Sequence, residues 1–442
     1  MDDALNFVYS FINYERKSNF RYDTKTFDME KFEKFLEDIG SPHLKYKTIH
    51  VVGTKGKGST SAILSSILKQ AGYKTGTYTS PHLENIRERI MINGDAIEEK
   101  SFVSIMEYLR KFIESNSLEL ANNYRTTFEL LTSTAFLHFA AENVDFAVIE
   151  AGLGARLDAT NVIKPELVLI TSISLDHTNI LGDTIDKIAY EKAGAIKNGI
   201  HVISSPQHET VREVVGDIAI KNGSEVDFLI KDNLVKNIIM KENGIAFDYS
   251  GEDCEIHNLW LPLAGDYQGE NALLAIKAFL SLSKDLKEDK RIIIKEGLEN
   301  VRWRGRLEIL SSNPLVVADV AHNPYSMKML LSRIKSIFEY DRILCVLSIS
   351  TNKDIPELCR ILSSYCNNFY VTFAEPSRSS TFDVLNENLS KNPDNTVCFE
   401  NSPKIALGKA LNEAGKGELV LITGSVYLVG SLLSHFKEDE RE

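Results

Sequence analysis

A run of glycine, lysine and hydroxyl side chains at residues 53–60 holds the chemistry that is clearest in this sequence. It comprises Gly53, Thr54, Lys55, Gly56, Lys57, Gly58, Ser59 and Thr60. A β-branched run, residues 48–52, precedes it, and a helical pattern, residues 59–70, follows at once. Glycines let a backbone approach phosphate oxygens, and the loop N–H groups, the helix N-terminus and Lys57 would face the anion. The layout predicts a phosphate-binding loop in which Ser59 or Thr60 holds Mg²⁺.

The loop departs from the usual spacing of such motifs. The pattern G-x-x-x-x-G-K-[ST] requires glycine at position 51 and a hydroxyl residue at position 58, but the chain has Val51 and Gly58 there. By spacing alone, a nucleotide site and an ordinary glycine-rich turn are equally good interpretations. The strand before the loop and the helix after it favour the nucleotide site.

Polar side chains also follow the other predicted strands of the first half. They are Ser80-Pro81-His82 after residues 74–79, Glu150 at the end of residues 146–150, and Asp176-His177 after residues 167–173. Ligands of a doubly wound parallel sheet bind at the carboxyl ends of its strands, so these side chains should meet beside the phosphate loop. A hydroxyl, a carboxylate and an imidazole suit Mg²⁺ or Mn²⁺ bound to a nucleotide.

Each of these side chains also has a plainer interpretation. Ser80 before Pro81 fits a turn equally well, and a lone histidine such as His177 is usually structural, although its place beside Asp176 favours a functional role. A purely structural role for Glu150 is less favoured, because it follows four apolar residues and an unpaired carboxylate would be costly to bury there. On bare sequence, Lys192 is a surface lysine of a helix.

The second half carries a cluster of its own. Asp319 and His322 follow a predicted strand at residues 315–319, and Lys353 and Asp354 follow another at residues 342–348. The middle of the chain adds Arg302, Arg304 and Arg306. A carboxylate, an imidazole and arginines opposite a phosphate loop would close on a nucleotide from a second side, although arginines at a linker are usually just solvated.

Strand and helix patterns alternate along the chain and predict an α/β fold. The expected strands of the first half are residues 48–52, 74–79, 146–150, 167–173 and 200–204, and the expected helices are 59–70, 101–114, 126–142, 184–197 and 269–282. Short β runs with Asn-Gly and Ser-Gly turns at residues 225–262 predict hairpins. We therefore expect an N-terminal, doubly wound phosphate-loop domain at 1–297 with a small β-hairpin region, a hinge at 298–306, and a smaller Rossmann-like α/β domain at 307–442.

The bulk composition narrows the class of protein. The chain has 442 residues, 43% of them hydrophobic and 25% charged, with a net charge of −12 and a pI near 5.5. Such an acidic chain is not expected to bind nucleic acid over a broad face. The sequence shows no signal-peptide pattern and no apolar run of membrane-spanning length. Five cysteines without a C-x-x-C spacing predict reduced thiols and a cytoplasmic protein.

Taken together, these motifs match a known family. The chain resembles folylpolyglutamate synthase/dihydrofolate synthase, a branch of the Mur ligase superfamily, from about residue 35 to the end. The resemblance is carried by residues 53–59, 80–83, 150–161, 176–182, 188–194 and 319–324. The family's phosphate loop has the same variant form, which accounts for Val51 and Gly58.

The resemblance implies roles for individual residues. Catalytic roles would fall to Lys57, Glu150, His177 and Lys192, the last being the lysine that is carbamylated in this superfamily. The implied nucleotide contacts are Gly53, Thr54, Gly56, Lys57, Gly58, Ser59, Thr60, Asn271, Arg306, Asp319 and His322. The implied ligands of Mg²⁺ or Mn²⁺ are Ser59, Ser80, Glu150 and His177. The implied substrate contacts are Ser80, Pro81, His82, Phe128, which would stack on a pterin ring, and Asp158, which would accept from the ring N–H groups.

The resemblance also implies an activity. ATP would phosphorylate the carboxylate of a folate, or of dihydropteroate, and the amine of L-glutamate would attack the acyl phosphate. We expect a monomer whose partners are these small molecules. A cell-wall Mur ligase is a poorer match because it needs a further UDP-sugar-binding domain before the loop. A regulatory nucleotide-binding protein without ligase activity is the alternative from another class, and the intact Glu150, His177 and Lys192 argue against it.

Two residues depart from the family pattern. Ala155 and Val320 each stand where the family usually has glycine. A side chain at either position would strain the backbone if the local conformation required a positive φ. Neither residue is an implied ligand, so the expected effect is on local geometry and substrate preference.

Overall fold

The computed structural model describes residues 1–16, 20–115, 126–375 and 378–436, and these form three sheets. The main sheet has the strand order β4-β3-β2-β5-β1-β6-β7-β8. Its strands are β1 (Lys47–Val52), β2 (Thr75–Tyr78), β3 (Ile90–Ile92), β4 (Asp95–Ala96), β5 (Phe146–Glu150), β6 (Leu167–Ile170), β7 (His201–Ser204) and β8 (Val226–Phe228). All neighbours from β2 to β8 pair in parallel, and β3 and β4 add an antiparallel edge. The predicted α/β fold is confirmed.

The register of the central strands brings their carboxyl ends together. Val51 of β1 lies opposite Glu150 of β5, and Val52 lies opposite Ile170 of β6. The chain crosses from β5 to β6 over β1, so β1 is the strand at which the winding reverses. The loops that follow β1, β5 and β6 therefore leave the same edge of the sheet, where ligands bind in such folds.

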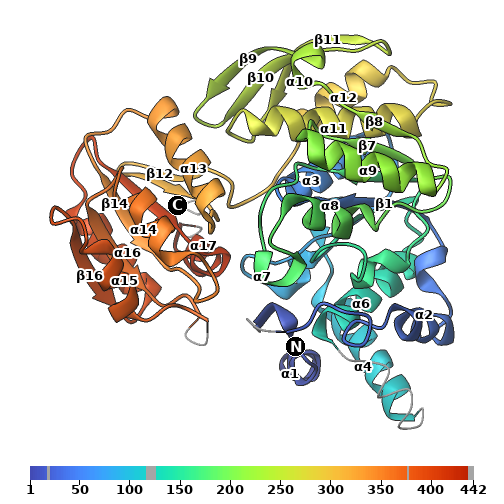
Figure 1. Cartoon of the computed structure of the whole chain (residues 1–442), viewed down its shortest axis with the longest axis horizontal. Coiled ribbons are helices and arrows are strands. Elements are labelled where there is room, and N and C mark those ends of the chain that lie inside the picture. Colours follow the sequence, from blue (N-terminus) through green and yellow to red (C-terminus); the bar gives the residue numbers. More distant parts are fainter. Residues whose placement is uncertain (17–19, 116–125, 376–377, 437–442) are drawn as a thin grey trace.

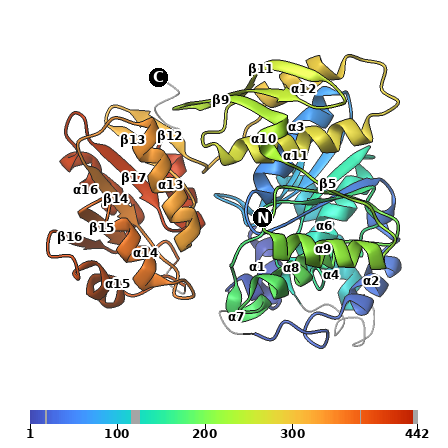
Figure 2. The ribbon, with the colours of Figure 1, turned by 45° about the horizontal axis from the view of Figure 1, so that its top comes forward.

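Helices cover both faces of the main sheet (Figures 1 and 2). On one face, α3 (Lys57–Gln70) packs against α11 (Tyr267–Leu282) and α12 (Lys290–Glu299). On the other face, one cluster contains α1 (Asp2–Ser10), α2 (Met29–Asp38), α4 (Glu99–Ser115) and α6 (Thr127–Ala141), and a second contains α8 (Ile185–Ala193) and α9 (Glu209–Lys221). Two short helices, α7 (Thr178–Leu181) and α10 (Lys231–Leu234), complete this part.

A small antiparallel sheet covers α11 and α12. It contains β9 (Val235–Lys241), β10 (Gly244–Ser250) and β11 (Glu255–Leu261) in the order β11-β10-β9. The hairpin prediction was wrong for residues 226–228, which form β8 and pair in parallel with β7 in the main sheet. A three-residue strand carries too little periodicity to separate a sheet edge from a hairpin arm.

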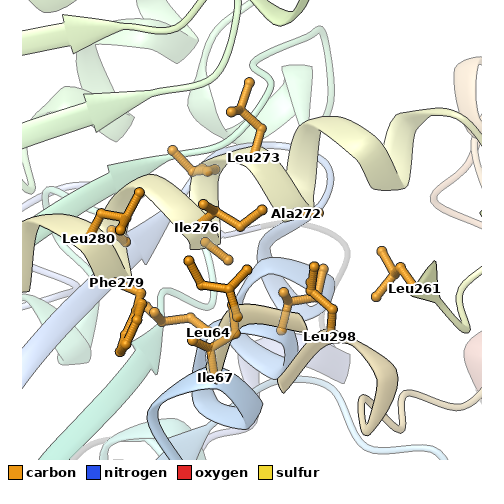
Figure 3. Packing of buried hydrophobic residues seen from close by; sticks show 14 of the residues in the cluster. Leu64, Ile67, Leu261, Ala272, Leu273, Ile276, Phe279, Leu280 and Leu298 are labelled. Atoms are coloured by element: carbon orange, nitrogen blue, oxygen red, sulfur yellow. The ribbon is translucent and has the colours of Figure 1, made fainter. Parts of the chain in front are cut away.

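The core beneath the small sheet fixes the position of α3. Leu64 and Ile67 of α3 contact the apolar face of α11, which includes Ile276 and Phe279, and Leu298 of α12 closes the cluster (Figure 3). All five side chains are fully buried. The start of α3 is therefore held rigidly against the sheet.

The third sheet forms a second α/β unit (Figure 1). Its order is β12-β13-β17-β14-β15-β16, with only the β12–β13 pair antiparallel. The strands are β12 (Glu308–Ser312), β13 (Leu315–Ala318), β14 (Ile343–Leu347), β15 (Asn368–Thr372), β16 (Thr396–Glu400) and β17 (Leu419–Thr423). The helices are α13 (Pro324–Ile337), α14 (Ile355–Leu362), α15 (Phe382–Leu389), α16 (Pro403–Glu413) and α17 (Val426–Leu433).

Two bulk predictions can be compared with the structure. Cys254, Cys345, Cys359, Cys366 and Cys398 are all free thiols, and three of them are buried. Within the described residues, every helix is too short or too polar to cross a bilayer.

We predict that Phe279→Ala destabilises this part of the molecule. Truncating a fully buried phenylalanine removes its contacts and leaves a cavity, which costs about 3–5 kcal/mol. Urea unfolding followed by circular dichroism measures the loss. The exposed Ile220 of α9 provides the control, because its side chain is 78% exposed and Ile220→Ala should change the unfolding free energy by less than about 0.5 kcal/mol. Equal effects of the two variants would contradict the packing described here.

Candidate functional site

The phosphate loop of the sequence joins β1 directly to α3. The helix begins at Lys57, two residues earlier than predicted, because Gly56 caps it with a φ of 89° that only glycine adopts readily. The first N–H groups of α3 have no partner within the helix. Together with the helix dipole, these N–H groups make this end of α3 favourable for an anion.

Close neighbours explain the unusual glycines of the loop. A Cβ on Gly56 would lie 2.2 Å from Oδ1 of Asn271. A Cβ on Gly58 would lie 2.7 Å from Cζ2 of Trp303, in the segment that joins the two large sheets. A rigid indole ring cannot yield as a flexible side chain would. The hydroxyl residue of the common motif therefore does not fit at position 58.

A cavity of about 370 Å³ opens at this edge of the main sheet. The predicted site residues that line it are Gly53, Thr54, Gly56, Lys57, Gly58, Ser59, Ser80, Pro81, Glu150, His177, Lys192, Asn271, Arg306, Asp319 and His322. The walls come from both large sheets, since Asp319 follows β13 while Glu150 ends β5. The tertiary structure thus brings most of the predicted site residues to one cavity.

Glu150 is a buried carboxylate in this cavity. Its side chain is 5% exposed. Oε2 accepts from the backbone N–H of Ser80 at 3.3 Å, and Oε1 lies 3.8 Å from Nζ of Lys57. Burial raises the pKa of Glu150, and Lys57 opposes the shift. A buried carboxylate with so few partners would be stabilised by a further cation.

Lys192 of α8 is buried against the phosphate loop. It is 5% exposed and donates from Nζ to the carbonyl oxygen of Gly53 at 2.6 Å. The interpretation of Lys192 as a surface lysine was wrong, because the face of α8 that carries it packs onto the sheet. Burial, reinforced by Lys57, lowers the pKa of Lys192 to about 7.

His177 caps the short helix α7 and has a φ of 50°. His177 is an exposed residue that lines both cavities. The surrounding protein displaces water from part of the ring and lowers the pKa of His177 to about 4, against the opposing effect of Asp176. The ring is therefore neutral near pH 7, which is the form that binds metals.

Asp176 connects the two large sheets. It accepts from Nζ of Lys55 at 2.7 Å and from Nδ2 of Asn323 at 3.0 Å. Burial raises the pKa of Asp176, but Lys55 and neighbouring cations outweigh burial and hold the pKa below its usual range. The sequence identified Asp176 only as the neighbour of His177, and it did not predict the contact with Asn323.

Asp319 follows β13 of the third sheet and lines the cavity. Its Oδ2 accepts from the N–H of Leu307 at 2.9 Å, and its Oδ1 accepts from the N–H of Ala321 at 2.7 Å. Burial raises the pKa of Asp319, and Arg306 opposes the shift. Leu307 has a φ of 48°, uncommon for a branched residue, so Asp319 holds the backbone in place where it enters β12.

A second cavity of about 250 Å³ adjoins the first. Both predicted pterin contacts, Phe128 and Asp158, line it. The two cavities share Ser80, Pro81, Gly152, Leu153, His177, His322 and Val426. Sequence reasoning missed the aromatic wall of Tyr14, Phe20, Tyr22 and Phe27. Four aromatic residues within fourteen positions were the available signal.

Two predicted residues lie outside both cavities. Thr60 is fully buried and donates to Oδ1 of Asn271 at 3.4 Å. His82 accepts at Nδ1 from Nε of Arg89 at 2.9 Å, and Arg89 in turn makes a bidentate pair with Glu15. Neither residue lines a cavity, and their predicted contacts with ligands remain predictions.

Comparison with known proteins agrees with this geometry. The Mur ligase middle domain matches residues 51–279, and the Mur ligase, glutamate ligase domain matches residues 305–426. The chain is 32% identical over 416 residues to the dihydrofolate synthase/folylpolyglutamate synthase of Bacillus subtilis, which covers 92% of this chain and 94% of that protein. It belongs to the folylpolyglutamate synthase/dihydrofolate synthase family of the Mur ligase superfamily.

Solved structures agree with this assignment. Folylpolyglutamate synthase of Mycobacterium tuberculosis in complex with ADP superposes with a TM-score of 0.87 at 27% identity, covering 98% of this chain and 99% of that one. A folylpolyglutamate synthase–AMPPCP–folate complex gives a TM-score of 0.81 at 28% identity, covering 98% of each chain. The predicted family is confirmed, and the chain is a ligase.

The two departures from the family pattern leave the backbone unstrained. Neither Ala155 nor Val320 is among the described residues that have a positive φ. The left-handed conformation in the first motif belongs to Gly154, with a φ of 67°. A side chain is therefore tolerated at both positions in this member of the folylpolyglutamate synthase/dihydrofolate synthase family.

We predict that Gly58→Ser weakens nucleotide binding about tenfold, because overpacking against Trp303 costs about 1–3 kcal/mol. Calorimetric titration with AMPPCP measures the effect, and adding Trp303→Leu should restore part of the affinity. Gly216→Ser on α9 is the matched control, since a Cβ there would meet nothing within 4 Å. Normal affinity in the Gly58 variant would contradict the steric explanation.

Proposed function

We propose that this chain is an ATP-dependent amide ligase that joins L-glutamate to the carboxylate of a folate. The observation that carries the proposal is the pair of adjoining cavities. One contains the phosphate loop and Glu150, and the other contains Phe128 and Asp158. An acid bound in the second cavity would point its carboxylate at the shared wall, next to the phosphates.

The reaction runs in two steps. A carboxylate oxygen of the folate attacks the γ-phosphorus of ATP, and ADP leaves with the bridging oxygen. The glutamate amine then attacks the acyl phosphate carbon, phosphate departs, and the amine loses a proton to give a γ-linked amide. Lys57 and the N–H groups of α3 would offset charge on the transferring phosphoryl group, and closure of the cavity would keep water from the acyl phosphate.

Ser59, Ser80, Glu150 and His177 are the proposed ligands of Mg²⁺, or Mn²⁺, beside the nucleotide. All four line the first cavity. The described residues contain no cluster of three or more His, Cys, Asp or Glu side chains suited to a metal, so phosphate oxygens would complete the coordination. The metal would supply charge neutralisation at the phosphates.

Lys192 is the proposed site of carbamylation. A carbamate forms when a neutral amine attacks CO₂ and loses a proton, and a pKa of about 7 leaves much of Lys192 neutral near pH 7. An ammonium beside a metal would be repelled, whereas the carbamate is an anion that can bind a metal.

Closure of the two sheets on ATP is the proposed conformational step. The proposed division is an ATP-binding domain at residues 1–297, a hinge at 298–306 and a glutamate-ligase domain at 307–442. The contact of Asp176 with Asn323 joins the two domains and supports this division. Two further contacts join the hinge to the first domain: Arg304 with Glu84 at 3.3 Å, and the cavity wall that Arg306 shares with Asn271. Asn271, Arg306, Asp319 and His322 would contact the nucleotide.

The choice between dihydropteroate and a reduced folate depends on the second cavity. Both substrates carry the pterin that Phe128 and Asp158 would recognise, so an assay with each acceptor in parallel distinguishes them. A cytoplasmic location and a monomeric state remain predictions.

We predict that Lys57→Ala and Glu150→Gln each lower kcat/KM by about 100-fold or more. The first removes a positive charge beside the phosphoryl group, and the second removes a proposed carboxylate ligand of the metal. The assay supplies ATP, labelled glutamate, and dihydropteroate or tetrahydrofolate. Lys69→Ala, on the exposed side of the same helix, and the exposed Glu142→Gln are the controls. Circular dichroism should show an intact fold in all four. Near-normal turnover in either site variant would overturn the proposal, as would ATP hydrolysis that requires no acceptor.

Carbamylation gives a separate prediction. Because the pKa of Lys192 is lowered to about 7, the neutral amine increases as pH rises, and stimulation by bicarbonate should grow from about pH 6 to about pH 8. Lys192→Ala should be inactive and partly rescued by acetate. Lys197→Ala, which changes a partly buried lysine that lines neither cavity, should keep its activity and show no effect of acetate. Absence of a carbamate by mass spectrometry in active enzyme would contradict the prediction.

A further inference from the structure

His50 is a polar residue in the middle of the central strand. Ile49 and Val51 point toward α3, so His50 points to the opposite face of the sheet. Its side chain is fully buried. Nε2 lies 2.9 Å from Oγ1 of Thr160, and Nδ1 has no hydrogen-bond partner in the described structure. An apolar side chain would avoid that unsatisfied atom, so the histidine requires an explanation.

Thr160 links His50 to a residue of the second cavity. Its hydroxyl donates to Oδ1 of Asp158 at 2.6 Å, and its backbone N–H donates to the same oxygen at 3.0 Å. The N–H of Leu153 donates to Oδ2 at 2.8 Å. Asp158 is therefore an acceptor in all three bonds, as an ionised carboxylate is.

The hydrogen-bond directions determine the tautomer of His50. A hydroxyl has one proton, and Thr160 gives its proton to Asp158, so Nε2 of His50 must be the donor in the remaining contact. The other arrangement would need a protonated Asp158 and would leave an N–H on Nδ1 without a partner. An orphaned buried donor is less common than an orphaned acceptor, so the Nε2–H form is favoured.

We propose that His50 is a positioning residue for substrate binding: its Nε2–H orients the Thr160 hydroxyl, which holds the Asp158 carboxylate toward the second cavity. The ligand that such a carboxylate recognises is a heterocycle with N–H donors, such as a pteridine ring. This inference rests on the proposed function for the identity of the ligand. The hydrogen-bond chain itself does not depend on it.

The electrostatics agree with a neutral His50. Burial lowers the pKa of His50 to about 3, and Lys197 adds to the effect. Burial raises the pKa of Asp158, and the N–H of Leu153 and the two donors of Thr160 oppose that shift. A neutral imidazole that donates from Nε2 supports the carboxylate without neutralising it.

Steady-state kinetics with His50 variants test the proposal. His50→Leu removes the donor at similar volume, whereas His50→Gln keeps a donor near the position of Nε2. His50→Leu loses the hydrogen bond to Thr160, whose hydroxyl bonds the Asp158 carboxylate. It should therefore raise the KM for the pteridine acceptor about five- to tenfold. The kcat and the KM for ATP should stay within about twofold of wild type. His50→Gln should restore the acceptor KM to within about twofold of wild type.

His43 provides the matched control. It is also a buried histidine with an unpartnered Nδ1, but it packs against Phe136 and, among the described residues, forms no hydrogen bond with Thr160 or Asp158. His43→Leu should therefore leave the acceptor KM unchanged. Thr160→Val should reproduce the effect of His50→Leu, and the double variant should be no worse than either single variant, because both break the same chain. An unchanged acceptor KM in His50→Leu, or additive effects in the double variant, would overturn the proposal.

Nitrogen NMR of ¹⁵N-histidine-labelled enzyme tests the hydrogen-bond chain without any substrate. The expected signal is a neutral imidazole protonated at Nε2 that disappears in His50→Leu. Protonation at Nδ1 would overturn the proposal. If wild-type enzyme showed no acceptor-dependent turnover, the proposed function would fail, while the Nε2–H signal and its change in Thr160→Val would still support the link from His50 to Asp158.

Discussion

Burial of α3 between the main sheet and the α11–α12 pair is the constraint on which the site depends. Leu64 and Ile67 pack the helix against α11, α12 and the main sheet, and this packing holds its first turn in place relative to β1. The free N–H groups at the start of α3 and the side chain of Lys57 are thereby held at the edge where β5 and β6 also end. The suitability of this edge for an anion therefore depends on core packing that lies behind the loop.

The same edge concentrates charge that is poorly compensated within the protein. Glu150 and Asp319 are buried carboxylates with raised pKa values, and Lys192 is a buried amine with a lowered one. Buried charged groups of this kind reduce folding stability unless bound ligands supply the missing charge or hydrogen-bond partners. A bound nucleotide with its metal ion, and a carbamate on Lys192, would supply these partners to Glu150, Asp319 and Lys192. We therefore regard the three residues as parts of a ligand site.

Two cavities with a common wall suit a reaction that passes an activated acid between them. Residues such as Ser80 and His177 belong to both cavities, so the phosphoryl donor and the acceptor carboxylate would meet at one place. The contact of Asp176 with Asn323 places the third sheet opposite the phosphate loop. The amide bond would then form in a space from which water is excluded.

The sequence by itself determined the α/β class, the phosphate loop, and the strand ends that carry Glu150 and His177. These features are local, because strand periodicity, helix periodicity and glycine turns each depend on a few neighbouring residues. It did not reveal β8 as a sheet edge, the burial of Lys192, or Trp303 behind Gly58.

Only the tertiary structure decided those points, along with the contact of Asp176 with Asn323 and the chain from His50 through Thr160 to Asp158. Each depends on residues far apart in the sequence whose contact is set by how sheets and helices pack. The residues next to each of these positions in the sequence do not predict which distant residues it contacts in the fold.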